Sequence, residues 1–311
     1  MNHYILVTAV KNEEKFLPQL IECVKNQSIR PIIWVIVNDG STDTTQSIIN
    51  KQKTLYNWIY DLTLEKGKRD IYARYTYVCK QGFDYSINLC QKKKLIFQYV
   101  CLLDADISLE RDYYKNIFQE FKLDKKLGIA CGNRLDLTNG SFKRINKRED
   151  EPYGAASVFR RQCFEEIGGY ILADASDNVA NAKAKMRGWN CKVFKSIHAK
   201  QLRTTNIINQ TAYGVWEEFK RHGEQDYYVN YSLYYVIIKA FRHSFAKFVG
   251  YPDNPPRPLY SGIAYLLGYL SCIFRRKKKI DDEETKKYYN KIHPRMVMRY
   301  YYIKLKKLFN D

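Results

Sequence analysis

The stretch FQYVCLLDAD, residues 97–106, joins a nearly unbroken apolar run to two aspartates, Asp104 and Asp106. A strand buried in a parallel sheet, with helices on both faces, has this composition. In open α/β sheets, ligands bind beyond the carboxyl ends of the strands. We therefore predict a buried strand here and a functional site at the point where it ends.

Three further apolar segments have the same character, and helical patterns lie between them. The segments are HYILVTAV (3–10), IIWVIVND (32–39) and YTYVC (75–79). One helix is predicted to begin near Leu17, because Pro18 is tolerated only in a first turn. Helical spacing of apolar residues also occurs over 43–53, 82–93 and 112–123. This alternation predicts an α/β fold, a doubly wound, mostly parallel sheet flanked by helices.

The sequence changes character near residue 200, so we predict two domains, 1–200 and 201–311. Fifteen of the 27 tyrosines lie in 201–311, and residues 275–311 carry 13 basic and 5 acidic residues. The uncharged stretch 258–274 has 17 residues, the lower limit for a membrane-spanning helix. We predict a helical, Tyr-rich and basic C-terminal region. Its helices either pack on the core or contact an anionic membrane surface.

Composition narrows the class of protein. A hydrophobic content of 45% with 15% aromatic residues excludes a disordered or fibrous chain. The formal net charge is +19, but no nucleic-acid recognition motif accompanies it, so we expect no nucleic acid among the partners. The eight cysteines form no CxxC pair, which is typical of buried thiols in a reducing compartment. With no secretory signal visible, we expect a cytoplasmic location, with peripheral attachment to the inner face of the cell membrane.

Polar residues follow the other two early strands as well. Asn12-Glu13-Glu14 comes after the first, and NDGSTD (38–43) ends the second. The simplest role of Asp39 and Asp43 is turn formation and helix capping. Asp104 and Asp106 repel one another and are costly to bury without a cation. Oxygen ligands suit Mg²⁺ or Mn²⁺, which keep coordination positions for substrate phosphates. The sequence therefore predicts a Mn²⁺ or Mg²⁺ site.

These motifs, in this order and spacing, resemble the family 2 glycosyltransferases of the GT-A fold. A later element, RRQCFEEIGGY (160–170), also matches, and the resemblance covers about residues 3–200. It implies a metal-dependent, inverting glycosyltransferase that moves a sugar from a nucleotide-sugar donor to an acceptor hydroxyl. The expected donor is a UDP-sugar, and the expected acceptor is a glycan or a lipid-linked glycan. The metal would offset the charge that develops on the leaving nucleoside diphosphate.

The resemblance also assigns residues to the donor and to the metal. The donor-binding residues that it implies are Thr8, Ala9, Val10, Glu13, Asp39, Asp104 and Arg161. Among these, Asp39 is expected to hydrogen-bond the base. Asp106 is expected to bind the metal, with Asp104 and His198 as further metal ligands.

An inverting transferase needs a base that deprotonates the acceptor hydroxyl. Counting back from Gly188-Trp189, the resemblance places this base at Asp177, with Asp174 as the second candidate. Ser176 and Val179 stand where the family has a glutamate and a second aspartate. Two alternatives therefore remain open: Asp177 caps a helix, or the protein is a non-catalytic nucleotide-sugar or glycan-binding protein on the same fold.

Overall fold

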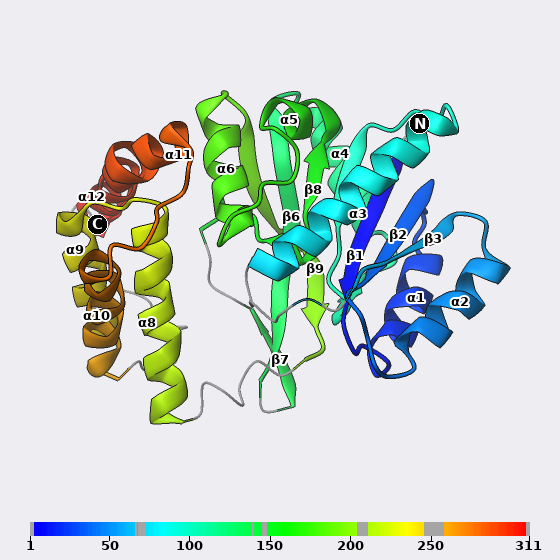
Figure 1. Ribbon diagram of the computed structural model, residues 1–311. Coiled ribbons are helices and arrows are strands. Elements are labelled where there is room, and N and C mark those ends of the chain that lie inside the picture. Colours follow the sequence, from blue (N-terminus) through cyan, green and yellow to red (C-terminus); the bar gives the residue numbers. More distant parts are fainter. Residues whose placement is uncertain are drawn as a thin grey trace. The chain divides into compact units, whose positions relative to one another are not determined.

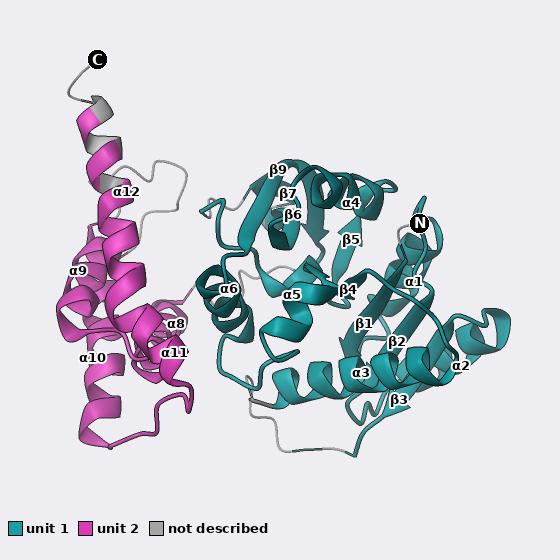
Figure 2. Cartoon of the chain, turned by 90° about the horizontal axis from the view of Figure 1, so that it is seen from above, with its two compact units in different colours: residues 1–205 teal, residues 206–311 magenta. Residues whose placement is uncertain are grey.

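The computed structural model of this protein describes residues 3–65, 67, 73–138, 140–144, 148–203, 211–245 and 258–308. The chain divides into two units, residues 1–205 and residues 206–311, coloured separately in Figure 2. The first unit holds the β-sheet, and the second is helical (Figure 1).

The strands described in the first unit form one nine-stranded sheet in the order β3-β2-β1-β4-β8-β6-β9-β5, with β7 paired to β6. Four strands run parallel, namely β1 (Tyr4–Val10), β2 (Ile33–Asn38), β3 (Ile59–Thr63) and β4 (Tyr99–Leu102). The others are β5 (Ile107–Leu109), β6 (Leu127–Thr138), β7 (Ser141–Arg144), β8 (Val158–Arg160) and β9 (Asn190–Gln201). Their pairings are antiparallel except between β6 and β9. The predicted α/β class is confirmed.

Helices cover both faces of the sheet, which explains the continuous apolar runs. Tyr4 and Leu6 of β1 belong to a core shared with α1 (Leu17–Lys25), α2 (Thr45–Leu55) and α4 (Tyr113–Leu123). Ile5 and Val7 point the other way, into a core shared with α3 (Ala73–Lys92), α5 (Arg161–Glu166) and α6 (Ser176–Met186). Both layers are visible in Figure 1. Each fully buried side chain of this size stabilises the fold by about 1.5–3 kcal/mol.

The strand predicted at 75–79 is wrong, because this segment lies inside helix α3. The β-branched and aromatic residues of this segment have an intrinsic preference for strands. That preference is weak, and the packing of the segment against the sheet overrides it. Val78 and Phe83 are buried against the sheet. At Gly82 a Cβ atom would lie 2.6 Å from side-chain atoms of both Val7 and Val37. The helix therefore approaches β1 and β2 closely.

The second unit consists of helices, as predicted for the C-terminal region. They are α8 (Ala212–Tyr228), α9 (Leu233–Ser244), α10 (Tyr260–Phe274), α11 (Glu283–Lys287), the π-helix η2 (Tyr288–Ile292) and α12 (His293–Leu308). None of the helices described is both long enough and apolar enough to cross a membrane.

Glycines bring the backbones of three of these helices together. A Cβ atom at Gly223 of α8 would lie 1.9 Å from the carbonyl oxygen of Tyr265 in α10. At Gly268 of α10 it would lie 2.0 Å from the carbonyl oxygen of Lys220 in α8. Gly262 makes the same kind of approach to α9, at 2.1 Å from a backbone oxygen. Only a residue without a side chain fits at these contacts.

A buried acid joins the same three helices. Asp226 of α8 accepts hydrogen bonds from Lys239 of α9 and from the hydroxyl of Tyr265 in α10. Burial, together with the negative charge of Asp226, raises the pKa of Tyr265, so this hydroxyl stays protonated and donates. The ion pair and the close backbone contacts hold α8, α9 and α10 in one packing arrangement.

Replacing Gly268 by alanine tests the glycine contacts. The added methyl group would overlap a backbone oxygen of α8, so the two helices must separate. We expect the free energy of opening of α8 and α10 to fall by about 1–3 kcal/mol, measured by hydrogen-exchange mass spectrometry on peptides from both helices. Ile263→Ala, on the exposed side of α10, is the control and should change this energy by less than about 0.5 kcal/mol. Equal losses in both variants would contradict the prediction.

Candidate active site

Two loops at the carboxyl edge of the sheet are bound to each other. β1 and β2 are parallel and pair in register up to Val10 and Asn38, so the loops that follow leave the same edge. The backbone N–H of Asn12 donates to Ser41 Oγ at 2.9 Å, and Asn12 Oδ1 accepts from the N–H of Thr42 at 2.8 Å. The tight turn at this point uses Gly40, whose φ is +61°.

The start of helix α2 completes this connection. The N–H of Glu13 donates to Thr45 Oγ1 at 2.8 Å. Asp43 Oδ1 accepts from the N–H of Thr45 at 3.0 Å, which is a helix-start interaction. The turn-forming role considered for Asp43 therefore agrees with its contacts, and the loops after β1 and β2 form one connected rim.

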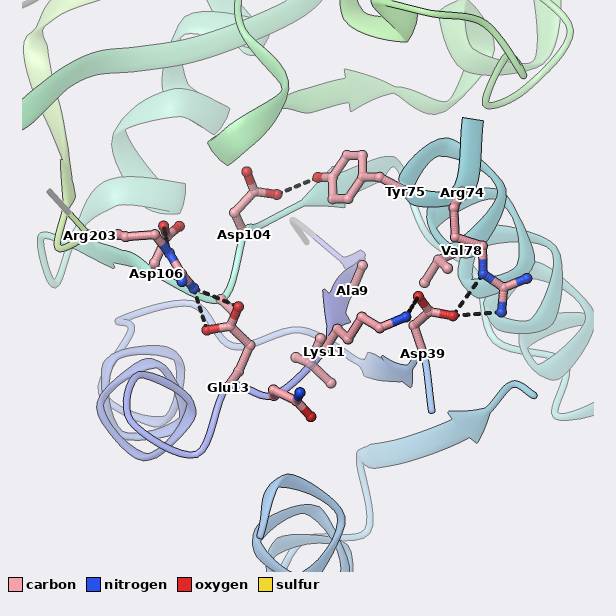
Figure 3. A pocket seen from close by; sticks show the side chains of 13 residues that line it. Ala9, Lys11, Glu13, Asp39, Arg74, Tyr75, Val78, Asp104, Asp106 and Arg203 are labelled. Carbon is pink, nitrogen blue, oxygen red and sulfur yellow. Dashed lines mark hydrogen bonds and ion pairs between the residues drawn. The ribbon is translucent and has the colours of Figure 1, made fainter. Parts of the chain in front are cut away.

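A cavity of about 570 Å³ opens inside this rim (Figure 3). Its volume is in the range of small-molecule and cofactor sites. The lining residues are Ala9, Val10, Lys11, Asn12, Glu13, Asp39, Arg74, Tyr75, Val78, Asp104, Ala105, Asp106 and Arg203. They come from the ends of β1, β2 and β4, the first turns of α3, and the segment after β9.

Asp39 is buried between two cations (Figure 3). Lys11 Nζ lies 2.8 Å from its Oδ2, and Arg74 donates to its Oδ1 from Nε at 2.8 Å and from Nη2 at 2.5 Å. Such charge-assisted contacts make the burial of a carboxylate tolerable. They also fix the orientation of the carboxylate, so Asp39 presents a preorganised hydrogen-bond acceptor to the cavity.

Asp104 has an unusual protonation equilibrium. Burial raises the pKa of Asp104 to about 7, and the negative charges of Asp106 and Asp177 add to the shift. The hydroxyl of Tyr75 donates to Asp104 Oδ1, which opposes that rise in the pKa. Burial also raises the pKa of Tyr75, so its hydroxyl remains a donor. Both the protonated and the ionised form of this carboxyl group are therefore accessible near neutral pH.

Arg203 bridges the other two acids of the cavity. Its Nη2 atom lies 2.6 and 2.7 Å from the two carboxylate oxygens of Glu13, and its Nε donates to Asp106 Oδ2 at 3.1 Å. Burial raises the pKa of Glu13, an effect that the charge of Arg203 opposes. The arginine side chain is 49% exposed, whereas Glu13 and Asp106 are 14% and 12% exposed. A cation reachable from solvent thus neutralises two nearly buried carboxylates.

The donor set of the cavity fits a hard divalent cation that is completed by substrate. Asp104 and Asp106 bring carboxylate oxygens to one cavity, separated by one residue. Within the described ranges no group of three or more His, Cys, Asp or Glu residues is arranged to hold a metal. Mg²⁺ needs no such cage, since one or two carboxylates, water and substrate phosphates are its usual ligands.

Asp177 is not among the described residues that line this cavity. It lies in the first turn of α6, and its Oδ1 accepts from the N–H of Asn178 at 2.8 Å. With Tyr153, Tyr170 and Asn181 it borders a much smaller cavity. Because its charge raises the pKa of Asp104, the two carboxyl groups are close enough to interact electrostatically. Asp174 lies in the loop before the same helix and is partly buried.

The structure gathers most, but not all, of the sequence-predicted residues in the cavity. Those that line it are Ala9, Val10, Glu13, Asp39, Asp104 and Asp106. Thr8 is fully buried instead, where its Oγ1 accepts from Trp34 Nε1 at 3.0 Å. Arg161 pairs with Glu165 at 2.7 Å on the surface of α5. His198 lies on β9, where its Nδ1 is 3.0 Å from Glu110, and it is not grouped with Asp104 and Asp106.

Three polar lining residues were not predicted: Arg74, Tyr75 and Arg203. A helical assignment of 73–92 would have placed Arg74, Tyr75 and Val78 on neighbouring turns near one face. Because a strand was predicted at 75–79, this helical spacing was not recognised. Arg203 follows the last residue of β9 by two positions, and no local motif marks it.

Two solved structures have the same fold. The mannosyltransferase PcManGT from Pyrobaculum calidifontis, in complex with GDP-Man and Mn²⁺, matches with a TM-score of 0.50 and 15% identity over 86% of this chain and 69% of that chain. Staphylococcus aureus TarS 1–349, in complex with UDP-GlcNAc, matches with a TM-score of 0.51 and 14% identity over 92% and 78% of the two chains. The first unit is thus a GT-A type domain.

Residues 5–196 match the sequence profile of Glycosyl transferase family 2, and the chain belongs to this family. Poly-beta-1,6-N-acetyl-D-glucosamine synthase of Staphylococcus aureus strain COL is 33% identical over 229 residues, which are 67% of this chain and 50% of that protein. The Staphylococcus epidermidis synthase is 30% identical over 228 residues, or 66% and 50% of the two chains. The chain therefore spans about half the length of these relatives. The predicted family is confirmed.

The titration of Asp104 can be measured by ¹³C NMR of its carboxyl carbon in the ligand-free protein with chelator present. We expect a midpoint near pH 7, and a higher one in Tyr75→Phe, which lacks the opposing hydrogen bond. Since the ordinary pKa is 3.8, the folded chain holds an extra proton between about pH 4 and pH 7. The free energy of unfolding should therefore fall as the pH rises through this window.

Asp104→Asn is the control for both measurements. It should remove the assigned resonance and flatten the pH dependence of the free energy of unfolding between about pH 4 and pH 7. A midpoint near 3.8 that is unchanged in Tyr75→Phe would show that the carboxyl group is well hydrated and contradict the prediction.

Proposed function

We propose that this protein is a metal-dependent, inverting glycosyltransferase. It takes a sugar from a UDP-sugar and transfers it to a hydroxyl group of a glycan or a lipid-linked glycan. The observation that carries the proposal is the cavity at the strand ends, where Asp39, Asp104 and Asp106 converge in a member of glycosyl transferase family 2. The relatives named as poly-β-1,6-N-acetyl-D-glucosamine synthases and the UDP-GlcNAc complex of TarS favour N-acetylglucosamine as the sugar.

Asp39 has the proposed role of reading the base. Its two oxygens are held by Lys11 and Arg74, and each carboxylate oxygen has lone pairs left to accept an additional N–H. The imide N–H of uracil is such a donor. Cytosine has no N–H at the equivalent ring position, so the same contact disfavours a CDP-sugar.

Asp104 and Asp106 are the proposed ligands of Mn²⁺ or Mg²⁺. When bound, this ion offsets the charge that develops on the departing diphosphate. Arg203 also supplies a positive charge at Asp106, with Nε 3.1 Å from Oδ2. Its guanidinium group is half exposed, so it can turn from the acids toward a diphosphate, where bidentate contacts with phosphate oxygens are favourable. Arg203 thus has two proposed anionic partners. It pairs with the acids when no donor is bound and with the diphosphate when the donor is bound.

Asp177 is the proposed general base, with Asp174 as the second candidate. Its carboxylate takes the proton of the acceptor hydroxyl while the acceptor oxygen bonds to the anomeric carbon. The bond from that carbon to the diphosphate oxygen breaks on the opposite side, which inverts the configuration. The electrostatic interaction between Asp177 and Asp104 supports this role, because a general base has to act close to the bound donor.

Asp177→Asn separates binding from transfer. We expect UDP-GlcNAc to bind with Mn²⁺ as in the wild type, by titration calorimetry, while transfer to a β-1,6-linked N-acetylglucosamine oligomer falls by about 10²- to 10⁴-fold. Asp84→Asn is the matched control, because Asp84 pairs with Lys80 on the surface of α3. Unaffected transfer in Asp177→Asn places the base elsewhere, and Asp174→Asn then tests the second candidate.

The same calorimetric titration and transfer assay, applied to the wild type, distinguish an enzyme from a non-catalytic binding protein. A wild-type chain that binds UDP-GlcNAc but neither transfers nor hydrolyses it would be a non-catalytic nucleotide-sugar-binding protein. A β-linked product formed from the α-linked donor, determined by NMR, establishes inversion.

Arg203→Gln tests the exchange of partners. Without its guanidinium group, Asp106 and Glu13 lose a competing cation, so Mn²⁺ should bind about two- to fivefold more tightly in the absence of donor. UDP should bind about tenfold more weakly in the presence of Mn²⁺, because a charged hydrogen-bond donor is lost. Electron paramagnetic resonance of free Mn²⁺ and calorimetry measure the two effects. Arg30→Gln, at an exposed position, is the control.

Effects of the same sign on both ligands would contradict this role of Arg203. Weaker binding of Mn²⁺ alone would show that the arginine only organises the acids. Tighter binding of UDP would show that it blocks the cavity.

A further inference from the structure

Helices α9 and α10 of the second unit carry stripes of large apolar side chains on their outer sides. On α9 the stripe is Tyr234, Ile237, Ile238 and Phe241, which are 39–60% exposed. On α10 and the residue before it, the stripe is Leu259, Ile263, Leu267 and Phe274, which are 47–83% exposed. The spacing of three and four residues puts each set on one side of its helix. On a water-exposed helix this side would normally be polar.

The two stripes belong to one packed body. The inward side of α9 contains Val236 and Ala240, both buried, and Ala240 approaches Gly262 of α10 through its backbone oxygen. Ser244 Oγ, at the end of α9, donates to the carbonyl oxygen of Leu259 at 2.7 Å. Each helix thus packs through its inward side, and the large apolar residues of the stripes remain on its outward side. We call the two stripes together the α9–α10 apolar face.

The segments that carry this face are basic, and one acid of α8, Glu224, pairs with Lys277 of the run that follows α10 at 3.4 Å. Residues 233–244 and 260–279 contain no acidic residue. Arg242 follows the α9 stripe, and the run RRKKK (275–279) follows the α10 stripe directly. The nearest acids in the sequence after that run are engaged locally: Asp282 caps α11 by accepting from Thr285, and Glu283 pairs with Lys286.

The length of α10 and the charge of the RRKKK run indicate which kind of surface the α9–α10 apolar face contacts. Helix α10 has 15 residues, or about 22 Å at 1.5 Å per residue, which is short of a hydrocarbon core of about 30 Å. An apolar stripe with basic residues at its end instead suits a helix that lies in the plane of a bilayer surface. The same face of a second copy would bring apolar residues, but no acidic partner for the RRKKK run. Anionic headgroups supply that partner.

We propose that the α9–α10 apolar face docks this protein onto an anionic membrane surface. The stripes insert among the acyl chains near the headgroups, and the RRKKK run contacts lipid phosphates. In this placement the described helices α9 and α10 hold the chain at a membrane without crossing it. It does not depend on the proposed donor chemistry of the first unit.

Vesicle flotation with the full chain tests the proposal. We expect binding to phosphatidylcholine vesicles containing about 30% phosphatidylglycerol, with weaker binding to pure phosphatidylcholine and at high salt. The variant Phe241→Ser/Ile263→Ser/Leu267→Ser should lose at least about tenfold in partitioning. Arg275→Gln/Arg276→Gln/Lys278→Gln should lose the preference for anionic lipid.

The control carries two apolar-to-serine changes in the first unit, Ile96→Ser and Leu123→Ser. These side chains are 71% and 80% exposed and lie outside the α9–α10 apolar face, so vesicle binding should be unchanged. Circular dichroism confirms that each variant is folded. Wild-type protein that does not float with anionic vesicles overturns the proposal, as does a triple-serine variant that binds like the wild type. A lipid-free dimer that the triple-serine variant converts to monomer would identify a second copy as the occupant.

Discussion

Carboxylates gathered at one edge of a sheet repel one another, and the first unit depends on how its own cations hold them together. Lys11 and Arg74 fix Asp39, and Arg203 spans Glu13 and Asp106. No cation is needed in the same way at Asp104, because burial raises its pKa and favours the neutral form, and the hydroxyl of Tyr75 donates to it. Because the cations come from the chain itself, the acidic cavity exists before any ligand arrives. A negatively charged ligand then meets positive groups already in place.

The parallel register of the sheet creates this concentration of charge. β1 pairs with both β2 and β4, so the loops after all three strands leave the same edge. The hydrogen bonds that Asn12 donates to Ser41 and accepts from Thr42 keep two of these loops together. The cores on both faces immobilise the strands, so the positions of the acids are set by packing that lies far from the cavity. Rigid elements therefore carry the reactive groups.

The sequence was informative where chemistry and periodicity coincide. The apolar run before Asp104 and the polar ends of the first two strands predicted the sheet edge and all four acids among the lining residues of the cavity. The sequence was uninformative where contacts between residues far apart in the chain determine the local structure or a pairing. Residues 75–79 have strand-like composition, yet they lie in helix α3, which packs closely against the sheet at Gly82. Arg203 reaches Glu13 across 190 positions of sequence, and no local pattern encodes that pairing. Arg161 and His198 matched motif positions but have partners elsewhere.

The glycine contacts of the second unit have a consequence for the solvent in which that unit is stable. Gly223 and Gly268 let α8 and α10 meet through backbone atoms, so close van der Waals contact joins the two helices beside the buried rings of Tyr227 and Tyr269. Helices in lipid associate by the same small-residue contacts, where the hydrophobic effect gives no help. The backbone contacts of this pair therefore belong to a kind that does not require the hydrophobic effect, and they are available beside acyl chains as well as in water.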